Sequence, residues 1–215
     1  AIAGKDLLVN LKVDAFCDLL STDAPAPGGG SVAALCSAIS GALSAMVANL
    51  TIGKKGYEKV TQEAMKLAPT GQDIKQKSLE IMDQDTAAFF ALMAAMRLPK
   101  KTEADINFRK AQIEKCTQEA INAPLTTMQL AVSAADLALK IAKIGNTNAL
   151  SDAGVAALTA FCASQSAYYN ILINIPGITD ENFKQKTLAE AKELWKQCKK
   201  ITDSVEKDVL EKLFG

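Results

Sequence analysis

The feature that most constrains the fold of this chain is a run without charged residues that extends from Ala24 to Gly53. It opens with Pro25-Ala-Pro-Gly-Gly-Gly-Ser31, in which the prolines restrict φ and the glycines remove every Cβ, so another group can approach the backbone closely. The pattern predicts that a helix follows, capped by Ser31, with free N–H groups facing whatever the glycines admit. Residues 33–48 of this helix, AALCSAISGALSAMVA, are almost all small, which indicates close packing against other helices.

The same stretch also has a purely structural interpretation, a glycine turn that leads into a buried helix. The residues alone do not favour a binding role over this structural one. A phosphate-binding P-loop is excluded because Gly-Lys-Ser/Thr is missing, and a dinucleotide fingerprint would need Gly-x-Gly-x-x-Gly after a strand. The sequence therefore predicts a point of close approach to the backbone without identifying what approaches it.

The rest of the chain is predicted to be helical. Apolar residues recur at helical spacing, and we find no strand signal, hairpin or internal repeat. Gly53-Lys-Lys-Gly56 should break one helix, and Gly145-Asn146 should stop another, with Asn146 suited to the left-handed conformation. The expected helices are 13–21, 33–52, 57–98 with a break or kink at 69–71, 102–144 with a bend at Pro124, 151–175 capped by Ser151-Asp152, and 180–214. Residues 4–11 form either a short helix or an extended arm.

This pattern predicts an all-α fold, a single-domain bundle of about five or six long helices that spans residues 1–215. Two central helices have no polar face, so other helices must pack on every side of them. Five or six helices in one subunit are too few to be sure of covering both. We therefore expect a homodimer that buries these helices further.

The absence of histidine limits the chemistry more than any other property of the composition. It excludes Ser-His-Asp and Cys-His catalysis, His-ligated metals and an imidazole proton shuttle, so acid–base work must fall to Asp, Glu, Lys, Tyr or water. The 24 basic and 24 acidic residues are interspersed without a basic stripe, so no nucleic-acid partner is expected. The five cysteines form no Cys-x-x-Cys pair, which disfavours a zinc or redox site and suits reduced thiols in the cytoplasm.

Two stretches without charge, 24–53 and 153–179, are long enough to raise the question of a membrane span. Both are rich in Ser, Thr, Asn and Cys and comparatively poor in Leu, Ile and Phe, so we expect buried helices of a soluble bundle and no membrane partner. The short apolar run after Lys5 and Asp6 does not suit a secretory signal.

A series of motifs carries a family resemblance along nearly the whole chain. Residues 24–57 contain Pro-Gly-Gly-Gly-Ser and Leu-Thr-Ile-Gly-Lys-Lys, and they are followed by Asp83-Gln-Asp-Thr-Ala-Ala-Phe89, Arg97-Leu-Pro-Lys100, Gly145-Asn146, Ser151-Asp-Ala-Gly154 and Tyr169-Asn-Ile-Leu-Ile-Asn174. Together they resemble the cyclodeaminase/cyclohydrolase family of folate enzymes. That family includes the C-terminal domain of formiminotransferase-cyclodeaminase and free-standing bacterial methenyltetrahydrofolate cyclohydrolases. The resemblance implies an all-helical dimer with a folate-binding groove close to the subunit interface.

The resemblance also implies one of two related reactions. A cyclohydrolase adds water to the cationic methenyl carbon of 5,10-methenyltetrahydrofolate and opens the ring to 10-formyltetrahydrofolate. A cyclodeaminase closes 5-formiminotetrahydrofolate through attack by N10 and expels ammonia. Both reactions need a carboxylate near a cation, and neither needs a metal or a cofactor beyond the tetrahydrofolate substrate. We favour the cyclohydrolase because no formiminotransferase domain accompanies this sequence, and a non-catalytic folate-binding or assembly dimer and a purely structural bundle stay as alternatives.

The candidate catalytic residues are Asp85, Lys54 and Asp83. The two carboxylates are two positions apart on an apolar helix and cannot share a face, so at most one points inward, and we favour Asp85, with Phe89 one turn on. A carboxylate among Ala and Phe should have a raised pKa, which suits a general acid or base, although a buried bridge to another helix fits equally well. Lys54 either acts in proton transfer, meets folate carboxylates, or pairs with a helix dipole.

The candidate substrate-binding residues come from several segments. Asn170 and Asn174 are one turn apart on an apolar helix, so their amides share a face and need partners, either another helix or the pterin edge. Arg97 either binds the anionic tail of a folate or is a solvated charge at a helix end. Capping alone would also explain Asn146 and Asp152. The full set is Pro27, Gly28, Gly29, Gly30, Ser31, Lys55, Tyr57, Arg97, Asn146, Asp152, Asn170 and Asn174, and no metal ligand is predicted.

Overall fold

The computed structural model describes residues 7–214, which contain helices and no strand and so confirm the predicted all-α fold. The helices are α1 (Val13–Leu20), α2 (Gly29–Asn49), α3 (Thr61–Met96), α4 (Glu103–Ile144), α5 (Leu150–Asn174) and α6 (Glu181–Phe214), with short 3-10 turns η1 (Leu8–Asn10), η2 (Thr147–Ala149) and η3 (Ile175–Gly177). Residues 4–6 of the segment predicted to be a helix or an arm lie outside the described range.

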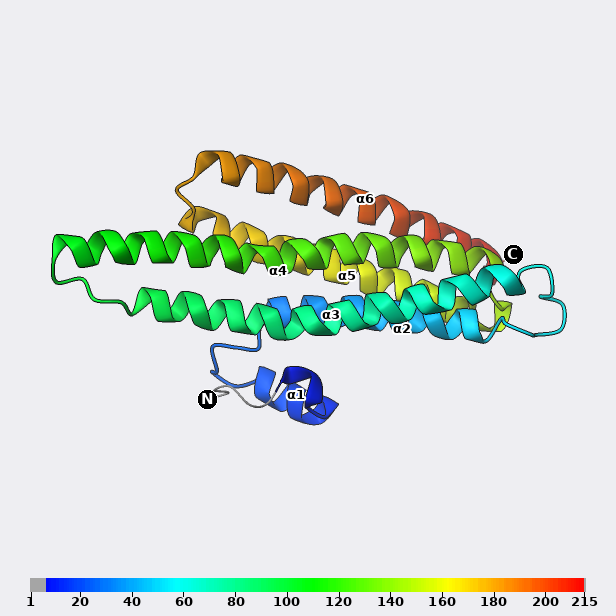
Figure 1. The fold of residues 1–215 in the computed structure, drawn as a ribbon. Coiled ribbons are helices and arrows are strands. Elements are labelled where there is room, and N and C mark those ends of the chain that lie inside the picture. Colours follow the sequence, from blue (N-terminus) through cyan, green and yellow to red (C-terminus); the bar gives the residue numbers. More distant parts are fainter. Residues whose placement is uncertain (1–6, 215) are drawn as a thin grey trace.

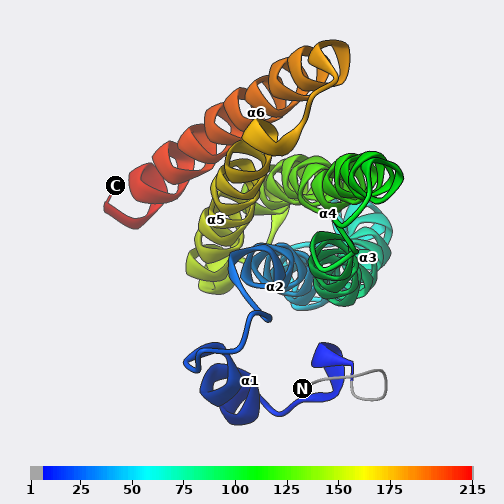
Figure 2. The ribbon, with the colours of Figure 1, turned by 90° about the vertical axis from the view of Figure 1, so that its left-hand side faces the viewer.

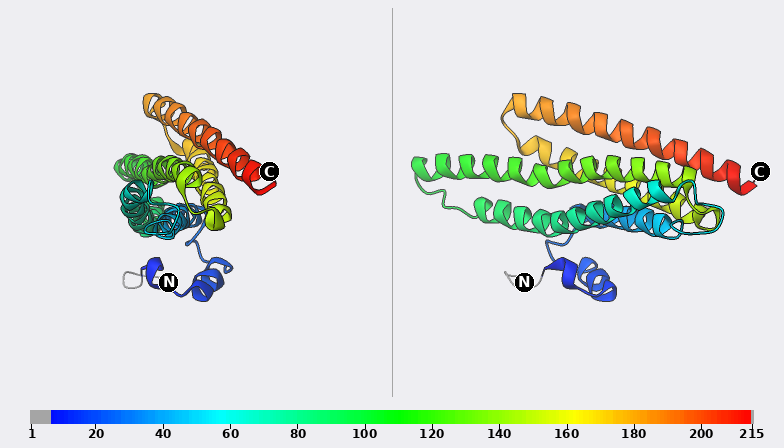
Figure 3. Two further views of the ribbon diagram at one scale, coloured as in Figure 1. Left: turned by 90° about the vertical axis from the view of Figure 1, so that its right-hand side faces the viewer. Right: turned by 45° about the vertical axis from the view of Figure 1, so that its right-hand side comes forward.

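The helices α2 to α5 form an elongated bundle, and α6 lies along its outer side (Figure 1). α4 is the central helix, since it packs against α2, α3, α5 and α6. Seen along the bundle, η1 and α1 lie outside these helices, on the side of α2 and α3 (Figure 2). They pack there through Leu8 and Phe16, which share a buried cluster with Ala34, Ile81 and Met82. α6 crosses the bundle obliquely (Figure 3), and it packs on α4 and α5.

α2 and α3 cross in direct backbone contact at a pair of glycines. A Cβ on Gly41 would lie 2.7 Å from the carbonyl oxygen of Gly71, and a Cβ on Gly71 would lie 2.9 Å from the Cβ of Ala45. A side chain at either glycine would therefore push the two helices apart. This close approach explains why α2 consists mainly of small residues.

α3 and α4 continue through their internal prolines. α3 is helical from Thr61 to Met96 with Pro69 inside, and α4 is helical from Glu103 to Ile144 with Pro124 inside. Of the two alternatives predicted for residues 69–71, a break or a kink, the break is therefore wrong. Packing of this stretch against α2 outweighs the backbone hydrogen bond that proline removes.

α2 begins earlier than predicted. Gly28 is its N-cap and Gly29 its first residue, so Ser31 lies inside the first turn and is not the cap. At the other end, α2 stops at Asn49, earlier than the predicted end at residue 52. Gly53 and Gly56 lie in the loop that follows, with φ angles of 70° and 91° that glycine adopts without strain.

The turn between α4 and α5 also differs from the prediction. Asn146 has φ −54° and is not left-handed; its side chain accepts a hydrogen bond from the N–H of Asn148 and caps η2. α5 begins at Leu150, so Ser151 and Asp152 lie in its first turn and do not cap it. The 3-10 turn η2 shifts the helix start by satisfying backbone groups ahead of Ser151.

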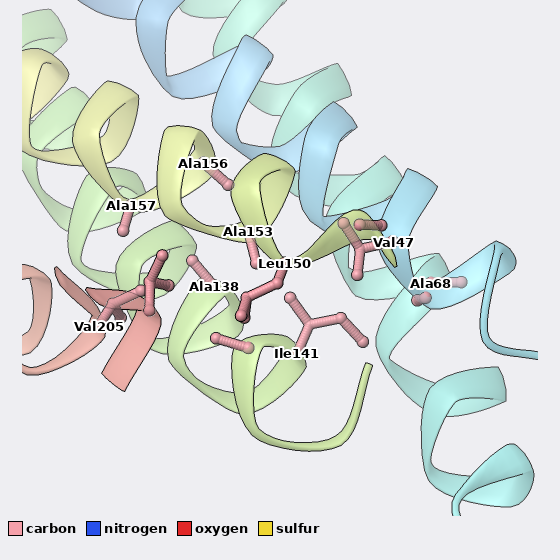
Figure 4. Close-up of a cluster of buried hydrophobic side chains, with 13 residues drawn as sticks. Val47, Ala68, Ala138, Ile141, Leu150, Ala153, Ala156, Ala157 and Val205 are labelled. Carbon is pink, nitrogen blue, oxygen red and sulfur yellow. The ribbon is translucent and has the colours of Figure 1, made fainter. Parts of the chain in front are cut away.

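The core away from the glycine motif is built from alanine and a few larger side chains. Figure 4 shows Ile141 of α4, Leu150 of α5 and Val205 of α6 close together, with Val47 of α2 nearby. The alanines between them let the helix backbones approach closely at the packing density of a protein interior.

Among residues 7–214, one broad surface of the bundle is apolar and exposed. We call it the α2–α5 face; it consists of exposed side chains of α2 and α5, namely Ile39, Met46, Leu50, Val155, Leu158, Cys162, Tyr169 and Ile173. α2 packs on α3, α4 and α5, and its N-terminal part also packs on η1 and α1 through Val32, Ala34 and Leu35. α5 packs on α2, α4 and α6, and the side chains of the α2–α5 face lie outside these contacts.

By length and hydropathy, two of the described helices could span a membrane, Gly29–Asn49 and Glu103–Ile144. Within their most apolar windows, 61% and 50% of the residues are buried in the bundle. Core helices of globular proteins pass the same test of length and composition, and the contacts of α2 and α4 account for their apolar character.

Candidate active site

Four helices enclose a small cavity at the N-terminal end of α2. Its volume is about 190 Å³. The walls are the backbone of 28–30 from α2, Asp85 and Phe89 from α3, Ala120 and Pro124 from α4, and Asn170 and Asn174 from α5, with Pro25 and Ala26 of the preceding linker. The fold thus brings the glycine motif together with polar side chains from distant parts of the sequence.

The carboxylate of Asp85 lies directly against the backbone of α2. A Cβ on Gly30 would collide with this carboxylate, so only glycine admits Asp85 at this point. Ser31 donates a hydrogen bond from Oγ to Oδ2 of Asp85 at 3.2 Å, and the same Oγ lies 3.3 Å from the hydroxyl of Thr86. Within residues 7–214, no lysine or arginine forms an ion pair with Asp85.

Burial raises the pKa of Asp85 above its ordinary value, and the hydrogen bond from Ser31 partly offsets the rise. A carboxylate with a raised pKa is a stronger proton acceptor than an exposed one, which suits acid–base catalysis. Asp83 lies elsewhere: its Oδ1 accepts a hydrogen bond from the backbone N–H of Leu8 at 2.7 Å. Of the two aspartates, the structure therefore places Asp85 at the cavity and uses Asp83 to hold η1 against α3.

Asn170 and Asn174 share one wall of the cavity, as their spacing predicts. The side-chain amide of each donates a hydrogen bond of 2.8 Å to the backbone carbonyl one turn earlier, of Ser166 and of Asn170. A Cβ on Gly29 would come within 3.3 Å of Nδ2 of Asn170, so this glycine also makes room for a polar side chain. The amide oxygens receive no hydrogen bond from the described part of the chain, which leaves them as acceptors for a ligand.

A second cavity of about 540 Å³ adjoins the first on the other side of the linker. Pro25 and Ala26 line both cavities, and the second is completed by residues that include Phe90, Met93 and Arg97 of the end of α3. Among the predicted cations Lys54, Lys55 and Arg97, only Arg97 lies near the glycine motif.

Lys54 and Lys55 lie at the opposite end of α2, in the loop that follows it. The 21 residues of α2 separate this loop from the glycine motif by about 30 Å at 1.5 Å per residue. Within one chain, neither lysine reaches the cavity that holds Asp85.

Tyr57, Asn146 and Asp152 also lie at this far end. The N–H of Thr147 donates to the hydroxyl of Tyr57 at 3.0 Å, and Nδ2 of Asn146 donates to the carbonyl of Leu50 at 3.3 Å. These contacts fasten the loop after α2 to the α4–α5 turn, while Asp152 belongs to the first turn of α5. Pro27, at the glycine end, is buried in the linker beside the cavity wall.

Sequence reasoning missed the wall that α4 contributes. Ala120 and Pro124 are one turn apart on α4 and so share one face of the helix. A small residue one turn before a proline, on a long and highly charged helix, is the signal that would have indicated a cavity wall. The hydroxyl of Thr86 was also missed, although it lies next to Asp85 in the sequence. Across residues 7–214, no group of three or more Asp, Glu, Cys or His side chains is close enough to hold a metal ion.

Comparisons with known proteins give one consistent result. A family model described as formiminotransferase-cyclodeaminase matches residues 12–193. A methenyltetrahydrofolate cyclohydrolase from Methylorubrum extorquens is 34% identical over 204 residues, which cover 95% of this chain and 98% of that protein. The formimidoyltransferase-cyclodeaminase of Rattus norvegicus is 30% identical over 89% of this chain, which spans only 36% of that longer relative. A crystal structure of a formiminotetrahydrofolate cyclodeaminase from Thermotoga maritima matches with a TM-score of 0.86 and 29% identity, over 95% of this chain and 98% of that one.

Proposed function

The chain belongs to the formiminotransferase-cyclodeaminase family, and we propose that it is a folate one-carbon enzyme that hydrolyses 5,10-methenyltetrahydrofolate to 10-formyltetrahydrofolate. The observation that carries the proposal is the buried carboxylate of Asp85 against the glycine motif, in a cavity walled by amide acceptors and Phe89. The 34% identity with a cyclohydrolase over nearly the full length of both chains supports the same reaction.

Asp85 has two tasks in this reaction. When ionised, its carboxylate attracts the cationic methenyl carbon and accepts a proton from the water that attacks that carbon. The resulting tetrahedral carbon carries a hydroxyl between N5 and N10. Proton return from Asp85 to N5 lets the C–N5 bond break, and loss of the hydroxyl proton to solvent leaves the formyl group on N10. One water is consumed and one proton is released.

We propose that the folate spans the two adjoining cavities. In the first, the amide oxygens of Asn170 and Asn174 would accept hydrogen bonds from the amino and N–H groups of the pterin, beside the apolar ring of Phe89. In the second, Arg97 would attract the carboxylates of the glutamate tail. We further propose that the reaction needs no metal or organic cofactor, since proton transfer and electrostatic attraction supply its chemistry.

We also propose that the protein works as a cytoplasmic homodimer. In the described part of the chain, residues 7–214, the α2–α5 face is apolar and exposed, with Tyr169 and Ile173 at 62% and 76% exposure, and a second copy of the same face would bury it. All five cysteines are free, which a reducing cytoplasm would maintain.

The second candidate reaction is the cyclodeaminase one. The Thermotoga maritima structure and the formimidoyltransferase-cyclodeaminases carry that name and match this chain over 89% to 95% of its length. The same cavity would serve it: N10 would replace water as the nucleophile, and the proton that Asp85 accepts from N10 would pass to the amine, which then leaves as ammonia.

The test is the absorbance of methenyltetrahydrofolate mixed with pure protein in a weakly nucleophilic buffer. Faster loss of the methenyl chromophore than in buffer supports the cyclohydrolase, provided that an Asp85→Asn variant purified alongside does not share the activity. If the wild type gives no acceleration, 5-formiminotetrahydrofolate is the next substrate, with methenyl formation and ammonia release as readouts. Failure with both substrates rejects both reactions, and tight binding of a reduced folate would then indicate a binding module.

A further inference from the structure

Ser31 and Thr86 form a pair of buried hydroxyls beside the carboxylate of Asp85. Oγ of Ser31 lies 3.2 Å from Oδ2 of Asp85 and 3.3 Å from the hydroxyl oxygen of Thr86. Ser31 has no exposed surface and Thr86 is 8% exposed, so both hydroxyls find their hydrogen-bond partners within the protein. Thr86 is not among the residues that line the 190 Å³ cavity, so it would not touch a folate bound there.

The single proton of the Ser31 hydroxyl decides the direction of these hydrogen bonds. A serine hydroxyl donates one hydrogen bond and also accepts, whereas an ionised carboxylate only accepts. When Asp85 is ionised, the Ser31 proton therefore goes to Asp85, and Ser31 can only accept from Thr86. The result is a series in which Thr86 donates to Ser31 and Ser31 donates to Asp85, and each hydrogen bond polarises and strengthens the next.

The hydroxyl of Thr86 has one competing acceptor, the backbone carbonyl of Met82 one turn earlier on α3. The distance to this carbonyl oxygen is 3.5 Å, longer than the 3.3 Å to Ser31. The Met82 carbonyl also belongs to the helix, where it accepts the backbone hydrogen bond from four residues on. Ser31 is therefore the better acceptor for Thr86 while Asp85 is ionised.

The helices around Asp85 present uncharged groups to it. α2 has no charged residue, and α4 and α5 line the cavity with alanine, proline and asparagine. On α3 itself, Asp83 accepts a hydrogen bond from the N–H of Leu8, and Asp23 and Arg97 line the adjoining cavity. The pKa of Asp85 is accordingly set by burial, which raises it, and by the hydrogen bond from Ser31, which lowers it.

We propose that Thr86 is a positioning residue, whose hydroxyl donates to Ser31 and thereby directs the Ser31 proton to the Asp85 carboxylate. This inference rests on the proposed function, because Asp85 is the base of that reaction. Ser31 then holds Oδ2 of Asp85, which leaves Oδ1 free to accept the proton of the attacking water. Without the Thr86 donor, the bond from Ser31 weakens and the carboxyl group of Asp85 keeps its proton to a higher pH.

Thr86→Val tests the proposal, because valine has the shape of threonine and lacks the hydroxyl. The measurement is a titration of the free protein by NMR with carbon-13 in the aspartate carboxyl groups, in which the Asp85 signal is the one that Asp85→Asn removes. The pKa of Asp85 should be higher in Thr86→Val than in the wild type, by less than in Ser31→Ala. In a Ser31→Ala background, Thr86→Val should add no further shift, since Thr86 acts through Ser31. Thr86→Ser keeps the hydroxyl and should restore the wild-type titration.

The matched control is Thr202→Val on α6. Thr202 is also buried, and its hydroxyl donates to the carbonyl of Ala157 at 3.4 Å, about 20 Å along α5 from the cavity residue Asn170. This variant loses a buried hydroxyl and should leave the titration of Asp85 unchanged. An unshifted Asp85 in Thr86→Val, an equal shift in the Ser31→Ala background, or a Thr86→Ser variant that titrates like Thr86→Val would each overturn the proposal.

Kinetics give a second readout that a merely structural role would not move. At pH values below the pKa of Asp85, Thr86→Val should lower turnover by about two- to tenfold, the equivalent of one hydrogen bond, and should leave KM unchanged. A raised KM with unchanged turnover would assign Thr86 to substrate binding and overturn the proposal. The titration needs no substrate, so it decides the role of Thr86 even if the wild type hydrolyses no folate.

Discussion

The Asp85 carboxylate lies against Gly30 at a point where α2 has no side chain, because a Cβ there would overlap the carboxylate. The contact connects a backbone requirement on one helix with an ionisable group on another. The neighbouring Ser31 adds the hydrogen bond that fixes the carboxylate, at 3.2 Å. The glycine motif therefore places the group to which we assign the proton transfer.

Gly30→Ala should displace Asp85 and lower turnover by about a hundredfold, since a misplacement of about 1 Å can cost this much. The matched control is Gly154→Ala in α5, where the new Cβ would meet Val209 at an ordinary 3.4 Å. That variant should keep full turnover and gain about 0.5–1 kcal/mol of stability. Steady-state kinetics with thermal melts measure both, and equal turnover of the two variants would contradict a role for the Gly30 contact.

Asp85→Asn should lower turnover by about 10²- to 10⁴-fold, the range that general acid–base catalysis supplies. Its melting temperature at neutral pH should be unchanged or higher. Burial raises the pKa of Asp85, so the ionised carboxylate weakens the fold above that pKa, and the neutral amide removes this cost. Asp83→Asn is the control on the same helix and should keep its turnover. If Asp83→Asn were as inactive as Asp85→Asn, the assignment of Asp85 as the base would be wrong.

Ser31→Ala should move the acid limb of the pH–rate profile to higher pH. The hydrogen bond from Ser31 lowers the pKa of Asp85 against the larger effect of burial, which raises it. Without that bond the carboxyl group keeps its proton to a higher pH, and only the ionised form accepts a proton from water. Turnover measured across the acid range, with correction for the spontaneous reaction, reveals the shift, and an unmoved acid limb would mean that another group titrates.

Gly41→Ala should destabilise the bundle by about 1–3 kcal/mol, the usual cost of an overpacked contact. The new Cβ would lie 2.7 Å from the carbonyl oxygen of Gly71, which is backbone and cannot rotate away. Chemical denaturation of the wild type and the variant measures the difference in unfolding free energy. A variant as stable as the wild type would show that α2 and α3 can separate without loss.

If the protein is the homodimer that we propose, Leu158→Glu should convert it to a monomer, because the substitution places a charge in the apolar α2–α5 face. Leu158 is 55% exposed in the chain, and Phe108 of α4, outside this face, is similarly exposed at 58%. Phe108→Glu is therefore the matched control and should stay dimeric. Light scattering after size-exclusion chromatography separates the outcomes, and a dimeric Leu158→Glu variant would place the interface elsewhere.

The predicted helices agree with the structure because each depends on residues within a turn or two. Glycines 53 and 56 lie in the loop between α2 and α3, as the sequence indicated, although α2 itself ends at Asn49, and the paired amides of Asn170 and Asn174 do share one face. Where the prediction was wrong, contacts between helices had overridden local preference. Ser31 bonds to α3 instead of capping α2, and α3 continues through Pro69 because it packs on α2 at Gly71.

The sequence by itself determined the all-α class, the family, the absence of histidine chemistry and the set of residues from which a site could be built. Only the tertiary structure decided that Asp85 and not Asp83 lies at the cavity, that α4 supplies a wall, and that Lys54 lies at the far end of α2. The physical reason is the range of the interactions. Helical periodicity is set by neighbours a few residues apart, whereas the cavity exists only where four helices meet, and their close approach depends on glycines whose partners the sequence does not name.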